Sequence, residues 1–556
     1  MSTATALRTE PERTEPPRGG NTLAGTGTLI RFALRRDRVR LPVWIGALLL
    51  GTLVSAVSFE ETYPDAAGRQ AIAETTNSPA GLAMSGPAHY LTDYQFGSML
   101  SHQMLSFVAV LVALMSVLIV TRHTRNEEET GRAELVRSSV VGRHAYLTAA
   151  LTVALLANLV LGALLAAALS TFTAEGYTTG GALLYGAAHT AIGLVFAGIA
   201  AITAQITAHS RGASGMALAT VGAAYALRAA GDAAGEGGVE WMSWLSPIGW
   251  IQRTYAFVDN RWWPLLLCLA LAAATAAVGY ALSTRRDLGS GLRPTRPGSP
   301  RATEALSRPI GFALRLHRGL LIGFAAALLL LGAMYGSILG EAEAMIEGID
   351  MMEEALAQLG GATVAESVAA MVLTPISAVA AVYVVMAGLR PRSEETSGRA
   401  EPVLSTGLSR AHWAGSHLAI ALAGGTLVML LGGFSLGATG WASTGDASLL
   451  PKLLGASLAY APALWVTAGI TMVLFGWFPR AAPAAWAIPL AAFLIGYLGT
   501  LLNFPQWVMN LDAFGHVPQL PAATMSWTPL LILTAFAAGL MWLGLTGFRR
   551  RDLDLT

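Results

Sequence analysis

The chain has 556 residues, of which 54% are hydrophobic and only 12% are charged, and its formal net charge is +1. A water-soluble chain carries about 25% charged residues, so this composition excludes an ordinary soluble protein. The balanced charge points to no nucleic-acid partner. The single cysteine, Cys268, excludes an internal disulfide and a cysteine-rich metal site.

Residues 1–28 are polar and rich in Pro, Thr, Glu and Arg, which predicts a disordered cytoplasmic tail. Twelve long apolar segments follow, each close to the ~20 residues that a helix needs to cross a bilayer. The chain is therefore predicted to be an all-α polytopic membrane protein. The expected spans are 41–59, 100–120, 145–171, 182–207, 212–229 and 263–283 in a first half (29–283), then 319–339, 367–388, 414–437, 453–477, 482–501 and 527–546 in a second half (310–548).

Arginines concentrate in alternate loops and predict how the spans are oriented. They lie before the first span and after every even-numbered span, whereas residues 341–366, between spans seven and eight, are acidic and contain no basic residue. Both termini, including a C-terminal tail at 549–556, are therefore expected in the cytoplasm. The abundance of Arg, Ala and Gly beside a single lysine suits a high-GC bacterium, so the membrane is expected to be its plasma membrane.

Three short motifs occur twice, in the same order and at the same topological positions. The two copies are separated by 280, 267 and 265 residues, respectively. This pattern predicts two tandem, parallel six-helix repeats joined by a cytoplasmic linker at 284–309. The paired motifs are Phe32–Arg38 with Phe312–Arg318 before the first span, Glu127–Val136 with Glu394–Val403 after the second span, and Arg285–Leu288 with Arg550–Leu553 after the last span.

Segments beside the spans carry further expectations. The basic Phe-Ala-Leu-Arg motifs suit amphipathic helices lying along the inner leaflet. Arg228, at the outer end of span 212–229, is expected to snorkel toward the interface. The aromatic segments 241–263 and 503–527 are expected to form non-helical or re-entrant outer caps.

The sequence offers no catalytic residues and no metal ligands of recognisable spacing. A Walker A loop needs a Gly-Lys-Ser/Thr ending, but the only lysine is Lys452, which Pro451 precedes and Leu453 follows. The chain is thus not expected to hydrolyse ATP itself. Carboxylates for ion coupling are nearly absent from the spans, and His102 and His189 are more typical of interhelical hydrogen bonds.

The repeated loop after the second span of each half is either a solvated charged turn or a docking surface for a cytoplasmic partner. Its occurrence in two otherwise divergent copies favours docking. With the two-half organisation and the basic helices, these loops make the chain resemble the membrane subunit of ABC-2 type exporters, most closely the duplicated actinobacterial antibiotic and multidrug permeases of the tetronasin type.

That resemblance implies a type V exporter fold and two copies of a separate ATPase subunit, which would bind ATP and Mg. It also implies one coupling helix in each loop. Pro402 stands where the first copy has Leu135, so the two docking sites need not be equivalent. The implied coupling residues are Glu127, Glu128, Thr130, Gly131, Arg132 and Glu134, and in the second copy Glu394, Glu395, Ser397, Gly398, Arg399 and Glu401.

The resemblance further implies a substrate path formed by spans two, five, eight and eleven. The uncharged spans favour a hydrophobic or amphiphilic cargo such as an antibiotic, a drug or a lipid-like molecule, carried out of the cell. A gradient-driven transporter with six plus six spans is the alternative, and a membrane enzyme acting on lipid or glycan is a more distant one. Aromatic or Met side chains that could line a path are Phe107, Met115, Tyr225, Tyr383, Phe493 and Tyr497.

Overall fold

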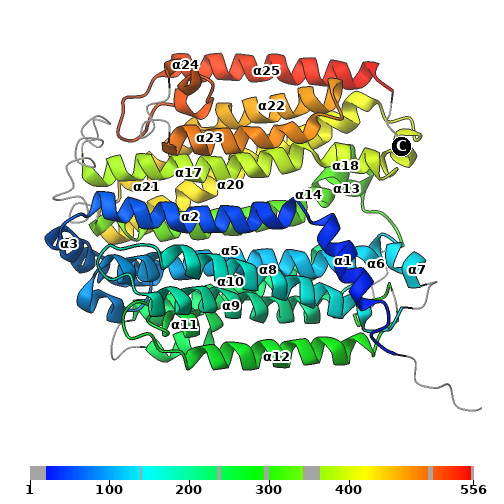
Figure 1. The fold of residues 1–556 in the computed structure, drawn as a ribbon. Coiled ribbons are helices and arrows are strands. Elements are labelled where there is room, and N and C mark those ends of the chain that lie inside the picture. Colours follow the sequence, from blue (N-terminus) through cyan, green and yellow to red (C-terminus); the bar gives the residue numbers. More distant parts are fainter. Residues whose placement is uncertain are drawn as a thin grey trace, which may run out of the picture. The chain divides into compact units, whose positions relative to one another are not determined.

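The computed structural model of the chain describes residues 21–137, 141–234, 239–287, 289–293, 298, 300–341, 363–498 and 505–552. Within these ranges every regular element is a helix and no strand occurs, as the all-α prediction requires. Contacts divide the chain into two units, residues 1–297 and 298–556, which run from blue to green and from green to red in Figure 1.

Among the described residues, ten helices are long and apolar enough to cross a bilayer, and they coincide with ten of the predicted spans. The segment 212–229 does form a long helix, α10 (Ser210–Ala233), but it is less apolar than the ten. The segment 482–501 forms only η4 (Ala482–Trp486) and α23 (Ala487–Leu498), and its last residues lie outside the described ranges. Twelve spans therefore remain a prediction.

Unit 1 is built around α9 (Thr179–Ile206), a helix that is mostly buried. It packs against α5 (Phe96–His123), α8 (Ala145–Leu169), α10 and α12 (Pro264–Ser283), and α2 (Arg40–Thr62) packs on α5 and α8. These helices run side by side in Figure 1. A Cβ on Gly162 would lie 2.5 Å from the Gly186 carbonyl oxygen. Glycine therefore allows the close approach of α8 and α9.

Unit 2 is also built from long helices that pack against one another. Two helix pairs dominate its packing, and α17 contacts both helices of the first pair and one helix of the second. The predicted span 453–477 is divided into two helices at the buried Tyr460. The helices are α14 (Pro309–Gly336) against α20 (Arg410–Thr444), α22 (Ala461–Trp477) against α25 (Trp527–Arg550), with α17 (Val364–Gly388) beside α14, α20 and α22, and α21 (Leu449–Ala459) on α20.

The two basic motifs before the first span of each half fold differently. In unit 1 the motif forms a separate helix, α1 (Thr26–Arg36), which packs against α8. In unit 2 the motif is continuous with α14, so the prediction of a second separate amphipathic helix is wrong. Arg36 and Asp37 make ion pairs with α6 and α5 at the turn after α1. Their counterparts in the second copy are Leu316 and His317. The tail prediction also ended too late, since α1 includes residues 26–28.

Short helices occupy the segments at the span ends opposite to these basic motifs. The segment 241–263 was predicted to be a non-helical or re-entrant outer cap, but part of it is helical. Ser246 is the N-cap residue of a buried short helix, α11. The acidic segment 342–362 lies outside the described residues. The short helices are α3 (Ala66–Thr76), α4 (Pro79–Met84), η1 (Ala88–Asp93), η2 (Glu240–Leu245) and α11 (Pro247–Gln252) in unit 1, and η3 (Leu339–Glu341), α24 (Gln506–Met509) and η5 (Phe514–His516) in unit 2. A further short helix, α13 (Glu304–Ser307), lies at the other end, directly before α14.

Arg228 does not snorkel toward the interface, so that prediction is wrong. Its side chain is 0% exposed and lies 3.6 Å from the Asp232 carboxylate, one helical turn later on α10. Its guanidinium donates hydrogen bonds to the carbonyl oxygens of Leu82 (3.4 Å) and Met84 (3.3 Å) on α4. Arg253, from the turn after α11, approaches Asp232 to 3.2 Å on its other side. The cluster thus ties α4 and α11 to α10.

Candidate functional site

The repeated loop folds in each unit as two short helices separated by a glycine, whereas the resemblance to ABC-2 type exporters implied a single coupling helix in each loop. In unit 1 the loop comprises α6 (Arg125–Glu129) and α7 (Arg132–Arg137), with Gly131 at a φ of 73° between them. In unit 2 it comprises α18 (Arg390–Thr396) and α19 (Ala400–Leu404), with Gly398 at a φ of 71°. Glycine adopts this left-handed conformation without the steric cost that a Cβ brings.

Replacing Gly131 or Gly398 with alanine is expected to destabilise the loop by about 1–2 kcal/mol, the cost of a left-handed conformation for an L-residue. No atom lies within 4 Å of the added Cβ at either position, so the backbone conformation alone sets the cost. Limited proteolysis of the loop in the purified protein measures the effect. The control is Gly215→Ala, also in open space but inside α10, where alanine is stabilising by roughly 0.5–1 kcal/mol. Equal proteolysis of all three variants contradicts the prediction.

The second glutamate of each loop is held by an arginine near the end of the last helix of its unit. Glu128 accepts hydrogen bonds from Arg286 at 2.6 and 2.7 Å. Glu395 accepts hydrogen bonds from Arg551 at 2.6 and 2.7 Å. The side chains of Glu128 and Glu395 are only 10% and 1% exposed. Both units therefore contain the same bidentate arginine–carboxylate pair, the strongest arrangement for such groups.

Further contacts tie each ion pair to the helices of its own unit. Arg125, fully buried, donates to Glu128 at 2.9 Å and to the Ala204 carbonyl oxygen at the end of α9, also at 2.9 Å. A cation at a helix C-terminus is favourable because it opposes the helix dipole. In unit 2 the Arg551 guanidinium lies 5.0 Å from the Phe475 ring and 5.1 Å from the Phe548 ring. Each loop is thus bound to the ends of long helices of its own unit.

The first glutamate of each loop has one equivalent and one different partner in the two units. Glu127 forms an ion pair with Arg36 of α1 and lies 3.9 Å from Arg132, the counterpart of Arg399. Glu394 forms ion pairs with two arginines of its own segment, Arg390 at 2.9 Å and Arg399 at 2.8 Å. Among the described residues, an ion pair between the first glutamate and the basic motif before the first span is therefore found in unit 1 alone.

The implied coupling residues separate into buried and exposed groups. The four glutamates of the two Glu-Glu pairs are buried or nearly so and are bound by arginines of the same unit. The residues around each glycine face outward: Thr130, Arg132 and Glu134 in unit 1, and Ser397, Arg399, Glu401 and Pro402 in unit 2 are all exposed.

Sequence reasoning did not identify Arg125, Arg286 and Arg551 as parts of the site. A signal was present in the third repeated motif. It places an arginine, with opposite charge to the repeated glutamates, at the end of the last span of each half, which is the same predicted side of the membrane.

The residues proposed to line a substrate path occupy different environments. Phe107 and Phe493 are 58% and 48% exposed. The Tyr225 hydroxyl donates to the Met84 carbonyl oxygen at 3.3 Å, and the buried Tyr383 hydroxyl donates to the Ile420 carbonyl oxygen at 3.4 Å. The Tyr497 side chain lies outside the described residues.

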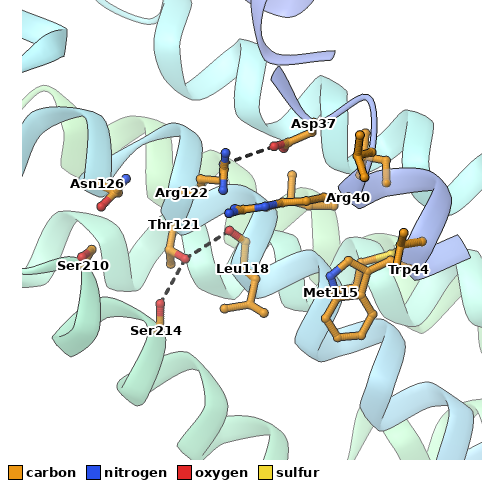
Figure 2. A pocket seen from close by; sticks show the side chains of 14 residues that line it. Asp37, Arg40, Trp44, Met115, Leu118, Thr121, Arg122, Asn126, Ser210 and Ser214 are labelled. Atoms are coloured by element: carbon orange, nitrogen blue, oxygen red, sulfur yellow. Dashed lines mark hydrogen bonds and ion pairs between the residues drawn. The ribbon is translucent and has the colours of Figure 1, made fainter. Parts of the chain in front are cut away.

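Of the six path residues, Met115 lines a pocket of about 520 Å³ in unit 1. Residues of α2, α5 and α10 form its walls (Figure 2). The pocket lies toward the α6 end of α5, since Arg122 and Asn126 also line it.

Ten described helices able to cross a bilayer define a multi-pass membrane protein. The family model for the multidrug efflux system permease Rv1217c, C-terminal domain, matches residues 27–282 and 306–549, and the chain belongs to this family. A similar protein is the multidrug efflux system permease protein Rv1217c of Mycobacterium tuberculosis (strain ATCC 25618 / H37Rv). The two are 38% identical over 559 residues, which cover 100% of each chain.

Proposed function

We propose that the chain is the membrane permease of an ATP-driven multidrug exporter of the ABC-2 type, with the type V fold of the tetronasin-type permeases. It moves hydrophobic or amphiphilic compounds out of a bacterial cell through the plasma membrane. In this proposal twelve spans form two parallel six-helix halves with cytoplasmic termini. The name of the similar mycobacterial permease supports the direction and the breadth of transport.

The observation that carries the proposal is the pair of exposed loop surfaces, each anchored from behind by a buried glutamate–arginine ion pair. A solvated turn needs no such anchoring. A surface that receives force from a partner does, because a loosely attached loop would move without moving the spans. The partner we propose is a separate ATPase subunit that binds ATP and Mg, with one copy on each loop.

The chain supplies the path and the docking surfaces, whereas its partner supplies the hydrolysis. The only lysine, Lys452, forms an ion pair with Glu366 at 2.6 Å. When ATP binding draws the ATPases together, force on α6 passes through Glu128 to Arg286 beyond α12, and through Arg125 to the end of α9. Force on α18 passes through Glu395 to Arg551, beyond α25. Such gating requires nucleotide and cargo to bind the alternating states with different affinities.

The proposal is tested with the double variant Glu134→Arg plus Glu401→Arg. Both glutamates are exposed and lie next to the loop glycines. Because like-charge contacts across an interface cost several kcal/mol, we expect recovery of the co-expressed ATPase with the tagged permease to fall by about tenfold or more. Drug efflux from cells is expected to fall with it, while the thermal stability of the purified permease stays unchanged.

The matched control is Glu304→Arg, which reverses one exposed charge on the same predicted side of the membrane but outside the two loop segments. It is expected to bind the ATPase and to export drug like the wild type. If no ATPase is recovered with the wild-type chain, and efflux stops when the proton gradient is collapsed, the chain is a gradient-driven transporter and the proposal fails.

A further inference from the structure

The pocket of unit 1 has one apolar wall and one cationic wall. Trp44 and Leu118 contribute apolar surface with the buried Met115 behind them, whereas Arg40 and Arg122 contribute guanidinium groups. We propose that this pocket binds an amphiphile carrying one anionic group, which the arginines hold while the apolar body lies against α2 and α5. The inference rests on the proposed export function and names the chemical class of cargo that this pocket selects.

Arg40 supplies a positive charge that the chain does not neutralise. Its side chain is exposed, and its guanidinium makes no hydrogen bond or ion pair with any other described residue. Figure 2 shows it reaching from α2 into the pocket, toward Thr121 and Leu118 of α5. An arginine pointing into a largely apolar pocket is a ready donor for a carboxylate or a phosphate.

Arg122 adds a second guanidinium, and the one carboxylate nearby does not balance both. The Arg122 Nε atom lies 3.2 Å from Asp37, a buried residue whose carboxylate is also bound by the His123 ring at 2.6 Å. Asp37 therefore faces Arg122 and His123 on α5 while Arg40 remains without a counter-charge. The pocket has net positive character.

The hydroxyl groups at the pocket are already engaged within the chain. The Thr121 hydroxyl donates to the Val117 carbonyl oxygen at 2.8 Å and accepts from Ser214 at 3.0 Å. The Ser210 hydroxyl donates to Glu129 at 2.5 Å. The arginines therefore supply the charge that holds a ligand, while the Asn126 amide and the Trp44 indole are the neutral polar groups left at the pocket.

The second copy of the repeat lacks these charges. Continuing the repeated motifs without a gap aligns Arg40 with Leu320 and Arg122 with Leu389. The arginines are therefore not part of the scaffold that the two copies share. A volume of about 520 Å³ suits one drug-sized molecule. In the predicted orientation this end of α5 faces the cytoplasmic leaflet, from which an amphiphile would enter.

The test measures binding to the full chain, without any ATPase, in phosphatidylcholine nanodiscs. The probes are dansylaminoundecanoic acid and its methyl ester, which share an apolar body and differ in the anionic group. The wild-type chain is expected to bind the acid about tenfold more tightly than the ester. Arg40→Gln is expected to weaken binding of the acid by about tenfold and to leave the ester unchanged.

Two further variants distinguish binding in the pocket from binding at the charged surface near the membrane. Arg35→Gln removes an exposed arginine of α1 that does not line the pocket, and it is expected to bind the acid like the wild type. Leu118→Trp narrows the pocket and is expected to weaken acid and ester alike. Equal binding of acid and ester by the wild type overturns the proposal. Equal effects of Arg35→Gln and Arg40→Gln overturn it as well, because surface charge alone would then explain the preference.

A repeat in nanodiscs that contain phosphatidylglycerol distinguishes a cargo from a bilayer lipid. Unchanged binding of the acid supports a cargo site, whereas displacement by phosphatidylglycerol means that the bilayer lipid itself is the anionic amphiphile in the pocket and overturns its assignment to cargo. Because no ATPase is present, failure here leaves ATP-driven export standing. Failure to recover an ATPase would in turn leave this binding result standing.

Discussion

Arg551→Ala is expected to destabilise unit 2 by about 3–5 kcal/mol, the range found when one partner of a buried ion pair is removed. Glu395 is 1% exposed and would lose both hydrogen bonds from Arg551, at 2.6 and 2.7 Å. The variant also removes the guanidinium from the rings of Phe475 and Phe548. The midpoint of thermal unfolding of the purified chain in detergent measures the loss.

The neighbouring Arg550 provides the control for this prediction. It is exposed, and Arg550→Ala is expected to change stability by no more than about 0.5 kcal/mol. The double variant Glu395→Gln plus Arg551→Met removes both charges and should regain most of the lost stability, since a buried pair replaced by uncharged groups of similar volume is often neutral. Equal unfolding midpoints for Arg551→Ala and Arg550→Ala would show that the pair is not structural.

Asp232→Asn is expected to have a comparably large effect on unit 1, about 3–5 kcal/mol. The change removes the carboxylate that lies between Arg228 and Arg253, at 3.6 and 3.2 Å. The two guanidiniums, 0% and 2% exposed, would then lack their shared buried counter-charge. The unfolding midpoint is again the measurement, and added protease is expected to cut near α4 or α11 first.

Glu240 is the exposed partner of Arg253, whose buried partner is Asp232, so it provides the control for this prediction. It also contacts Arg253, at 3.0 Å, but its side chain is 47% exposed. Glu240→Gln is therefore expected to cost less than about 1 kcal/mol, as for surface ion pairs. Adding Arg228→Gln to Asp232→Asn is expected to restore part of the stability. A loss as large for Glu240→Gln as for Asp232→Asn would contradict this account of the cluster.

Hydropathy was sufficient to locate the ten helices that can cross a bilayer, because long apolar segments leave the backbone no other way to satisfy its hydrogen bonds. It was less informative for α10, whose alanines and glycines are only weakly apolar and whose Arg228 looked like an interfacial residue. Burial of Arg228 depends on Asp232 and on Arg253, which lies 25 residues along the chain from Arg228. Asp232, one turn along the same helix, was a visible partner; Arg253 was not.

The repeated loops were recognisable from sequence, but the direction of their side chains was not. Glu128 and Glu395 occupy the same position in the two copies, which indicates that a glutamate is needed there. This observation fits a residue that docks a partner and a residue that anchors the loop equally well. The choice depends on Arg286 and Arg551, more than 150 residues away in the chain. Likewise, nothing in the Phe-Ala-Leu-Arg motifs alone indicated that one copy turns at Asp37 while the other continues into α14.

The sequence separation of these ion pairs has a consequence for biosynthesis. Glu128 and Glu395 are translated 158 and 156 residues before their arginines. Each loop must therefore wait, with its carboxylate in water, until the last helix of its unit has been synthesised and inserted. Because Arg286 is made before unit 2 begins, the loop of unit 1 can close while the ribosome is still translating unit 2. In the predicted orientation, a chain truncated before Arg286 or Arg551 would therefore leave the glutamate of that loop without its arginine on the cytoplasmic side.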